Sequence, residues 1–503
     1  MIKNAIIKIS DDEYYDDAQL LVRSFFVDAD IIREGKLSAN SEVFKEGNSH
    51  IEEKGENTIH IDADQYVPVE KAALGTRGER HDCFKRNLYT ELAHITGKTL
   101  PWGFLTGVRP AKRATEMIKR GGMISPQKVK DEFSKKYMTS PEKAKLALEV
   151  ALNERRVLSE KGICAEPVDY NGFSVYVGIP FCPSTCLYCS FPSAPITSCG
   201  EELVEAYIES LLTEIKIGRE IYERHLKKKG LQYIPLKLSS VYIGGGTPTS
   251  LTPGQLERIL RCLKENFAMG DDIEFCAEAG RPDSIDNEKL YTLKENGVNR
   301  ISVNPQTMNQ KTLDILGRAH TTEDVYRAFE LARKTGFNNI NTDIILGLPE
   351  EGEAEVEKTV NEIKILSPDS LTVHSLAIKR ASRLKINARD YSDMSRENSE
   401  KLIAMTSQLA RDMDMLPYYM YRQQNMAGNF ENTGYAKPGK ESVYNIVIME
   451  EVQDILAFGA GASSKFLMGN NRFERAVNVK DIRNYTDRTD EMIARKELLL
   501  SGK

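Results

Sequence analysis

Three cysteines lie close together in one short segment of the sequence. Cys182, Cys186 and Cys189 form a C-x3-C-x2-C loop, directly after an apolar segment that predicts a strand. Three thiolates on one loop can hold three corners of a cubane 4Fe-4S cluster, which normally takes four protein ligands. The fourth iron then stays open and can bind and activate a small molecule. The spacing therefore predicts an oxygen-sensitive redox enzyme.

A structural zinc site is the main alternative for this loop. Zinc usually takes four ligands in two pairs, and the sequence has no second His or Cys pair at that spacing. Incidental core cysteines also fit poorly, because the loop is rich in Pro and Ser rather than helical or strand-like. We interpret the five other cysteines as free thiols, with Cys199 close enough to the loop to be of interest. They are Cys83, Cys164, Cys199, Cys262 and Cys276.

Length and composition exclude several classes of protein. The 503 residues suffice for two to four domains, and 28% charged residues with a net charge of −6 argue against disorder. No apolar run approaches the ~18 residues that cross a bilayer. The apolar segment at the N-terminus is too short for a secretory signal, and acidic residues follow it too early. We therefore expect a cytoplasmic protein with reduced thiols, no membrane span and no nucleic-acid partner.

Strand and helix patterns alternate from about residue 172 to residue 378. The predicted strands are 173–179, 238–243, 273–279, 299–303, 339–346 and 370–376. The predicted helices are 201–226, 253–267, 286–296, 309–316, 322–335 and 353–366. Six βα units in a row require a parallel sheet that winds one way, and an open sheet or a partial barrel both fit. The cysteine loop follows the first strand, at the edge where α/β proteins bind their ligands.

We divide the chain into an accessory region (1–165), a core domain (166–390) and a C-terminal cap domain (391–503). The cap is predicted to be mainly helical, with a polar, tyrosine-rich loop. The only tryptophan, Trp102, is expected in a packed interdomain loop. The accessory region is predicted to form a small α/β unit followed by helices. Its predicted strands are 2–9, 42–46 and 57–63, and its predicted helices are 15–27, 84–97, 110–120, 126–137 and 141–161.

Polar residues and glycines gather where successive predicted strands end. A Gly-rich turn lets backbone approach a ligand closely, and a carboxylate could accept hydrogen bonds from ribose hydroxyls. Singly, each of these residues is more often structural, but their shared position favours a ligand site. They are Gly244–Pro248 after the second strand, Glu278 at the end of the third, Gln306 after the fourth, Asp343 in the fifth, and Arg318 after a short helix.

These segments together resemble the oxygen-independent coproporphyrinogen III oxidases, which are radical S-adenosylmethionine (SAM) enzymes. The resemblance covers about residues 170–470. The long N-terminal region and the three-cysteine loop resemble the coproporphyrinogen dehydrogenase branch; a shorter form has a fourth cysteine where this chain has Phe191. The matching motifs are the cysteine loop, Gly244–Pro248, Asn299–Gln306, Leu316–His320, Asp343–Pro349, Leu416–Asn429 and Gly434–Gly439.

The resemblance implies a six-unit partial (β/α) barrel that binds a 4Fe-4S cluster and SAM. The cluster ligands would be Cys182, Cys186 and Cys189. Tyr176 would lie beside the cluster-bound SAM, Gly245 and Glu278 would contact it, and Ala377 would lie near its adenine. A second SAM, or substrate, would meet the following residues: Gly246, Thr247, Gln306, Arg318 and Asp343. No catalytic side chain is assigned.

The implied reaction is oxidative decarboxylation of two propionates of coproporphyrinogen III, giving protoporphyrinogen IX. It requires a tetrapyrrole substrate, an electron donor for the cluster and an electron acceptor that the sequence does not name. Arginine forks suit carboxylates, so cations after the third and sixth strands and in the cap are candidate propionate anchors, although for each one a surface charge is the first interpretation. They are Arg281, Lys379, Arg380, Arg383 and Arg422. We expect Arg380 or Arg383 to bind a propionate.

Two other functions remain open at this stage. One is a related radical SAM enzyme that methylates or opens haem. The other is a haem-trafficking protein whose cluster is vestigial or auxiliary. The long region before the cysteine loop disfavours trafficking, because the trafficking proteins that the chain resembles start near that loop.

Overall fold

The computed structural model describes most of the chain. It covers residues 2–26, 29–34, 51–53, 57–68, 75–106, 109–121, 125–166, 168, 170–231, 237–270, 272–377, 398–423, 430–468 and 472–501. The chain divides into two compact units. The first unit is Met1–Ala151 with Tyr421–Glu431, and the second is Leu152–Met420 with Asn432–Lys503. The domain boundaries after residues 165 and 390 stay predictions.

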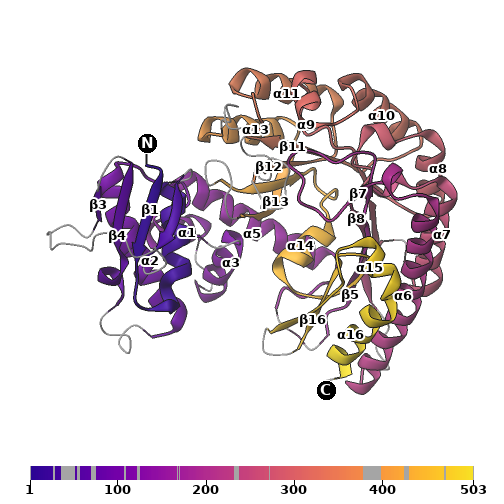
Figure 1. The fold of residues 1–503 in the computed structure, drawn as a ribbon, viewed down its shortest axis with the longest axis horizontal. Coiled ribbons are helices and arrows are strands. Elements are labelled where there is room, and N and C mark those ends of the chain that lie inside the picture. Colours follow the sequence, from indigo (N-terminus) through magenta and orange to yellow (C-terminus); the bar gives the residue numbers. More distant parts are fainter. Residues whose placement is uncertain are drawn as a thin grey trace. The chain divides into compact units, whose positions relative to one another are not determined.

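A parallel sheet of six consecutive strands forms the centre of the second unit (Figure 1). The strands are β5 (Phe173–Ile179), β8 (Leu238–Gly245), β9 (Glu274–Ala277), β10 (Arg300–Ser302), β11 (Ile340–Leu346) and β12 (Ser370–Ser375). Each pairs in parallel with the next. β5 and β12 do not pair with each other, so the six units wind one way without closing. This is the predicted partial barrel.

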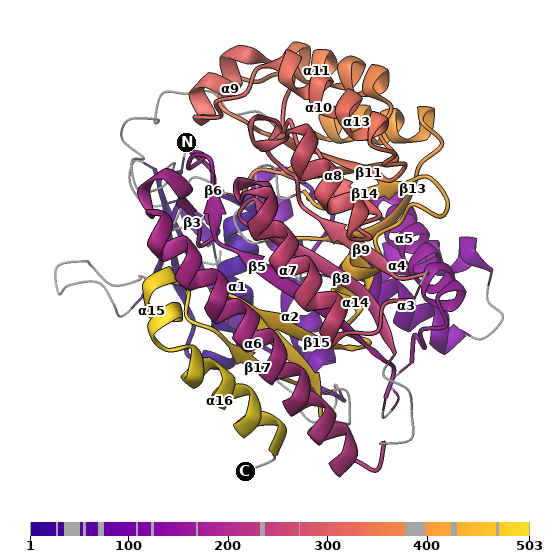
Figure 2. The ribbon, with the colours of Figure 1, turned by 90° about the vertical axis from the view of Figure 1, so that its right-hand side faces the viewer.

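Helices connect these strands and lie outside them; α6, α7 and α8 run across the front of the strands in Figure 2. The helices are α6 (Glu201–Lys228), α7 (Pro253–Asn266), α8 (Asn287–Glu295), α9 (Gln310–Leu316), α10 (Thr322–Lys334) and α11 (Glu353–Leu366). Their ends agree with the predicted ranges within two residues. Capping residues explain this agreement: Thr252 and Thr321 accept hydrogen bonds from backbone N–H groups in the first turns of α7 and α10.

The C-terminal part of the second unit contains the expected helices and also strands that sequence analysis missed. The helices are α13 (Glu400–Asp412), α14 (Val443–Glu450), α15 (Ile482–Asp487) and α16 (Thr489–Ser501). The strands are β13 (Leu416–Tyr421), β14 (Asn432–Ala436), β15 (Asp454–Phe458), β16 (Ser463–Leu467) and β17 (Phe473–Val477). β14 pairs with β12 and β15 with β5, so the sheet extends at both edges.

The prediction of a tyrosine-rich loop is therefore wrong for Leu416–Tyr421, because these residues form the strand β13. Both faces of this strand are largely buried, as are all five residues of β15. A strand buried on both faces lacks the alternation of apolar and polar residues by which strands are recognised in a sequence.

The first unit has a four-stranded sheet in the order β2-β1-β4-β3. Its strands are β1 (Asn4–Lys8), β2 (Asp30–Arg33), β3 (Ile51–Glu53) and β4 (Thr58–Asp62). Its helices are α1 (Asp12–Phe25), α2 (Arg77–Thr96), α3 (Pro110–Gly121) and α4 (Pro126–Tyr137), and α5 (Pro141–Glu160) begins in it. α2 starts earlier than predicted, because Thr76 and Glu79 form a capping box before a polar first turn. The predicted strand 42–46 lies outside the described residues.

Trp102 lies in the core of the first unit and is fully buried. Its indole N–H donates to Glu431 Oε2 at 2.7 Å, and Lys143 Nζ donates to Glu431 Oε1 at 2.6 Å. The Arg422 guanidinium lies 5.7 Å from the centre of the Trp102 ring and donates to the Leu105 carbonyl. The predicted packing of the tryptophan loop is thus confirmed, but its expected position between domains is not, because Trp102 and these partners all belong to the first unit. Arg422 is 4% exposed, so its interpretation as a surface charge is wrong.

Within the described parts of the chain, no helix combines the length and the apolar character needed to cross a membrane.

Candidate functional site

The Gly-rich turn after β8 holds the start of the cysteine loop. Gly246 N–H donates to the Ile179 carbonyl at 2.7 Å, and Thr247 N–H donates to the Phe181 carbonyl at 2.6 Å. Thr247 Oγ1 also lies 3.5 Å from Cys182 Sγ, within hydrogen-bonding distance of sulfur. Cys182 is therefore fixed by neutral donors from the neighbouring strand.

Glycine is required at two positions of this turn. A Cβ atom on Gly246 would lie 2.5 Å from the Phe181 carbonyl oxygen, closer than real Cβ contacts come, and 3.0 Å from Cys182 Sγ, which is tighter than most. Gly245 has a φ of +104°, a conformation that other residues rarely adopt. Both glycines were predicted to let backbone approach a ligand. The structure adds a second reason, because Gly246 also lets the turn approach the cysteine loop.

The middle of the loop is anchored by the end of α9. Leu187 N–H donates to the Leu316 carbonyl at 2.9 Å, and Ser184 Oγ donates to the Gly317 carbonyl at 3.0 Å. The Leu187 side chain is 3% exposed and packs in an apolar cluster at the C-terminal ends of the strands. The other buried members of this cluster are Leu316, Ile345, Leu348 and Leu376. Apolar packing and backbone bonds together fix Cys186, the neighbour of Leu187.

Two arginines meet the thiol of Cys186, which is 8% exposed. Arg281 Nη1 lies 3.4 Å from Cys186 Sγ, and Arg318 Nη1 lies 3.7 Å from it. Arg318 also donates to the Asn304 carbonyl at 2.6 Å and to Tyr188 Oη at 3.2 Å. Arg281 is 3% exposed, so its interpretation as a surface charge is wrong.

Glu278 lies beside a platform of three stacked tyrosines. Tyr242 Oη donates to Glu278 Oε1, and the rings of Tyr176, Tyr242 and Tyr444 are nearly parallel, with centres 4.6–6.3 Å apart. Burial raises the pKa of Glu278 to about 7, although the Tyr242 hydrogen bond lowers it. Asp343 raises the pKa further because it adds a second negative charge. Glu278 can therefore accept or donate a hydrogen bond near neutral pH.

The α14 helix presents Tyr444 to this platform because Glu274 caps its start. Glu274 accepts hydrogen bonds from Ser442 Oγ at 2.9 Å and from the Val443 N–H at 2.5 Å. A carboxylate at a helix N-terminus satisfies free N–H groups and interacts favourably with the helix dipole.

Gln306 and Asp343 are joined through the backbone of β11. Gln306 N–H donates to the Asp343 carbonyl at 3.1 Å, and Ile345 N–H donates to the Gln306 carbonyl at 2.9 Å. Gln306 has a φ of +70°, a strained conformation for a residue with a side chain. Burial works to raise the pKa of Asp343, but His374 and Asn341 outweigh it and the pKa is lowered. Asp343 is therefore a carboxylate at neutral pH.

The structure brings most of the predicted residues to the C-terminal ends of the parallel strands. Contacts link Cys182 to Thr247, Cys186 to Arg318, and Gln306 to Asp343. Ala377 follows β12 and is half-buried, and its side chain makes no polar contact that could link it to the others. The candidate anchors Lys379, Arg380 and Arg383 lie outside the described residues.

Three tyrosines of the site were not predicted from the sequence. Tyr188 lies in the loop beside Cys189, so its position alone could have indicated it. Tyr242 precedes Gly244 by two positions in β8 and therefore shares its face of the strand. Tyr444 had no sequence signal, because it reaches the site only through the packing of α14.

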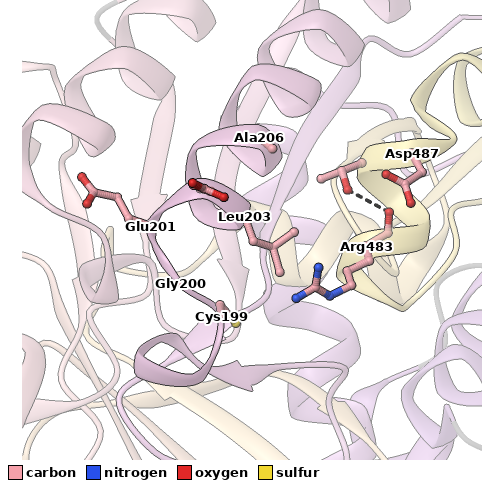
Figure 3. Close-up of a pocket in the computed structure, with 9 residues that line it drawn as sticks. Cys199, Gly200, Glu201, Leu203, Ala206, Arg483 and Asp487 are labelled. Carbon is pink, nitrogen blue, oxygen red and sulfur yellow. Dashed lines mark hydrogen bonds between the residues drawn. The ribbon is translucent and has the colours of Figure 1, made fainter.

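A surface hollow of about 620 Å³ lies elsewhere in the second unit (Figure 3). It is lined by the segment before α6, the first turns of α6, and α15, with Cys199 and Arg483 among its residues. The thiol of Cys199 donates to the Pro195 carbonyl at 3.5 Å. None of the predicted cofactor residues lines this hollow.

The donor set at the sheet edge fits a 4Fe-4S cluster with a polar ligand beside it. In the described part of the chain, no three His, Cys, Asp or Glu side chains gather tightly enough to share one metal ion, so the fit rests on the kind of donors. The loop offers three cysteines, and in a cubane each thiolate binds a different iron. Gln306 Oε1 and Arg318 Nε are buried and, among the described residues, lack hydrogen-bond partners. Such orphaned atoms suit a ligand that supplies partners.

Comparison with known proteins places this site in context. The model of the radical SAM superfamily matches residues 176–363, from Tyr176 through α11. A solved structure titled as coproporphyrinogen III oxidase (HemN) from Escherichia coli, a radical SAM enzyme, aligns with a TM-score of 0.48 and 24% identity. It covers 67% of this chain and 73% of that chain.

Two curated relatives from Bacillus subtilis match at length. The oxygen-independent coproporphyrinogen-III oxidase-like protein HemZ is 38% identical over 79% of this chain and 77% of its own length. The heme chaperone HemW is 31% identical over 62% of this chain and 75% of its own length. The chain therefore belongs to the radical SAM superfamily, and within it to the family of oxygen-independent coproporphyrinogen-III oxidase-like proteins.

Proposed function

We propose that this chain catalyses the oxygen-independent oxidative decarboxylation of coproporphyrinogen III to protoporphyrinogen IX. Radical SAM enzymes use a 4Fe-4S cluster and SAM, and the bound pair supplies a 5′-deoxyadenosyl radical that abstracts a hydrogen atom. A propionate β-carbon has no acidity that a side-chain base could use, so hydrogen-atom abstraction suits this reaction. Each propionate then loses CO2 and gives one electron to an acceptor, leaving a vinyl group.

The proposal assigns separate tasks to groups of this chain's residues. Cys182, Cys186 and Cys189 would hold the cluster. Tyr176, Gly245, Glu278 and Ala377 would hold SAM, with the Glu278 carboxyl accepting hydrogen bonds from ribose hydroxyls. A second SAM, or substrate, would meet the remaining predicted residues, which are Gly246, Thr247, Gln306, Arg318 and Asp343. Arg380 or Arg383 would bind a substrate propionate.

The observation that supports the proposal is the convergence of Thr247, Gln306, Arg318 and Asp343 with the cysteine loop at one edge of the sheet. The single side chain of Arg318 contacts two residues of the loop, Cys186 and Tyr188, and also the Asn304 carbonyl after the fourth strand. Polar groups from several strands thus surround the loop, as a site for a cofactor and a large polar substrate requires.

The test is anaerobic reconstitution of the cluster, followed by addition of a reductant, SAM and coproporphyrinogen III. Mass spectrometry should find two successive losses of CO2 with two hydrogens each, together with 5′-deoxyadenosine. SAM cleavage with an unchanged tetrapyrrole would refute the substrate. A methylated or opened tetrapyrrole would replace the oxidase with the related haem-modifying enzymes.

A second candidate is haem binding for delivery, and the similarity to the heme chaperone HemW favours it. The same reconstituted protein should then bind haem tightly and leave coproporphyrinogen III unchanged. A haem titration followed by absorbance, run beside the decarboxylation assay, separates the two. Tight haem binding without SAM cleavage would replace the oxidase proposal.

A further inference from the structure

Arg281 contacts the cysteine loop through both of its Nη atoms. Nη1 lies 3.4 Å from Cys186 Sγ and 3.3 Å from the Ser184 carbonyl oxygen, and Nη2 donates to Ser184 Oγ at 3.0 Å. The side chain comes from the segment after β9. One buried cation therefore binds both backbone and side-chain atoms of the loop, next to one of its three thiols.

Asp283 fixes the orientation of this guanidinium. It accepts from Arg281 Nε at 2.9 Å and from Nη2 at 2.8 Å, which is the two-point geometry that arginine forms with carboxylates. His320 lies behind the pair and is fully buried, with Nδ1 3.9 Å from Asp283 Oδ1. Burial and the cation of Arg318 lower the pKa of His320 to about 3, so it does not compete with Arg281 for the carboxylate.

The two sides of the loop differ in charge. Cys182 meets the neutral hydroxyl of Thr247, whereas Cys186 meets the guanidiniums of Arg281 and Arg318. Arg318 divides its other donors among Tyr188 and the carbonyls of residues 280 and 304. Arg281 hydrogen-bonds the loop at three points, all at Ser184 and Cys186, and its charge also acts on Cys182.

We propose that Arg281 is a positioning residue that holds Cys186 through an N–H···S hydrogen bond and raises the reduction potential of a cluster bound there. The inference rests on the cofactor part of the proposed function. A reduced cluster carries one more negative charge than an oxidised one, and a buried cation stabilises that charge. Hydrogen bonds to sulfur and net charge are established determinants of cluster potential.

The test compares Arg281→Gln and Arg281→Lys with the wild type after anaerobic reconstitution. Arg333→Gln is the matched control: Arg333 also pairs with an aspartate (Asp369, 2.7 Å) and donates to backbone carbonyls, but it makes no contact with the loop. Iron and sulfide per chain are measured first. The midpoint potential follows from a redox titration monitored by electron paramagnetic resonance.

Arg281→Gln should retain the cluster and shift its reduction equilibrium about tenfold toward the oxidised form, which is 59 mV for a one-electron couple. Arg281→Lys should lower the potential less than Arg281→Gln does, because lysine keeps the charge but loses the two-point geometry of the guanidinium. Arg333→Gln should leave the potential unchanged. Equal potentials in wild type and Arg281→Gln would overturn the inference.

If Arg281→Gln fails to load a cluster or to fold, Arg281→Lys decides. A lowered potential in that variant supports the inference, and the wild-type potential overturns it. The result is separable from the substrate question. A cluster that shifts as expected in a protein that does not decarboxylate coproporphyrinogen III refutes the substrate and leaves the role of Arg281 standing. A wild-type chain that binds no cluster refutes both.

Discussion

The first unit buries Trp102, Lys143 and Glu431 as a group in which each carboxylate oxygen accepts a hydrogen bond. In the second unit, Gln306 Oε1 and both ring nitrogens of His320 are equally buried but, among the described residues, have no hydrogen-bond partner. A buried polar group without a partner costs free energy, so it persists where a function requires it. The comparison sets a fully paired buried group against buried groups at the candidate site that a ligand could pair, although the described part of the first unit also holds unpaired buried atoms such as Thr139 Oγ1.

Among the variants proposed here, Cys186→Ala should have the largest effect, which is the loss of the cluster. Removing one of three thiolates should abolish cluster binding and SAM cleavage, while the first unit stays folded. Iron analysis and 5′-deoxyadenosine release measure the loss, and Trp102 fluorescence reports on the first unit because it is the only tryptophan. Cys199→Ser is the control, since Cys199 lies in the surface hollow. A full cluster in Cys186→Ala would remove Cys186 from the ligand set.

Glu431→Gln tests the other side of the comparison. It keeps an acceptor for the Trp102 indole but leaves the buried Lys143 cation without its counter-charge. The expected cost is about 3–5 kcal/mol of unfolding free energy, measured by denaturant titration of Trp102 fluorescence. Iron content should not change. Glu149→Gln breaks only the exposed pair with Lys145 on α5 and should cost less than about 0.5 kcal/mol. Equal costs would show that the buried pair is not special.

Glu278 predicts a pH dependence of stability in the protein without cofactors. Its pKa is raised to about 7, so the folded state binds the proton more tightly than the unfolded chain. The stabilisation is present below about pH 4.5 and is lost as pH rises through 7, up to about 3 kcal/mol. Glu278→Gln has no titrating carboxyl here and so does not lose this stabilisation. The unfolding free energy of the variant minus that of the wild type should therefore increase from pH 5 to pH 8. A constant difference in urea midpoints would contradict the raised pKa.

Gln306→Gly should show the smallest effect on stability, with the opposite sign. Glycine accepts the φ of +70° and removes the orphaned oxygen, so the unfolding free energy should rise by about 1 kcal/mol. SAM binding, measured by calorimetry, should weaken. Asp414→Gly relieves a similar φ of +58° in the turn between α13 and β13 and should leave SAM binding intact. A destabilised Gln306→Gly would mean that the side chain contributes to the fold itself.

Local patterns predicted the barrel well. The helices α6 to α11 alternate with the six parallel strands, and side-chain caps such as Thr252 and Thr321 mark the starts of α7 and α10. The strands β13 to β17 were missed because they lie outside the series of alternating strands and helices that marks the barrel, although they are longer than β9 and β10. Their place in the sheet depends on pairing with β12 and β5, which no local pattern encodes.

Sequence patterns suggested many residues of the candidate site, and their roles stay predictions, but the patterns did not reveal the contacts among them or the tyrosines Tyr188, Tyr242 and Tyr444. The cysteine spacing and the glycine turn are local, and both led to the same edge of the sheet. The bond from Arg281 to Cys186 joins residues 95 positions apart, and the tyrosine platform needs Tyr444 from α14. Such contacts arise from tertiary packing, so the sequence offered Arg281 only as one cation among several.

The pairing of Trp102 with Glu431 also constrains the order in which the chain can mature. The two residues are 329 positions apart, and every strand of the parallel sheet is encoded between them. A nascent chain emerging N-terminus first therefore presents Trp102 and Lys143 long before their carboxylate has been synthesised. The first unit cannot complete its core during early translation. A chain stopped before residue 431 would retain a buried lysine without its counter-charge, and such a chain is a natural target for cellular quality control.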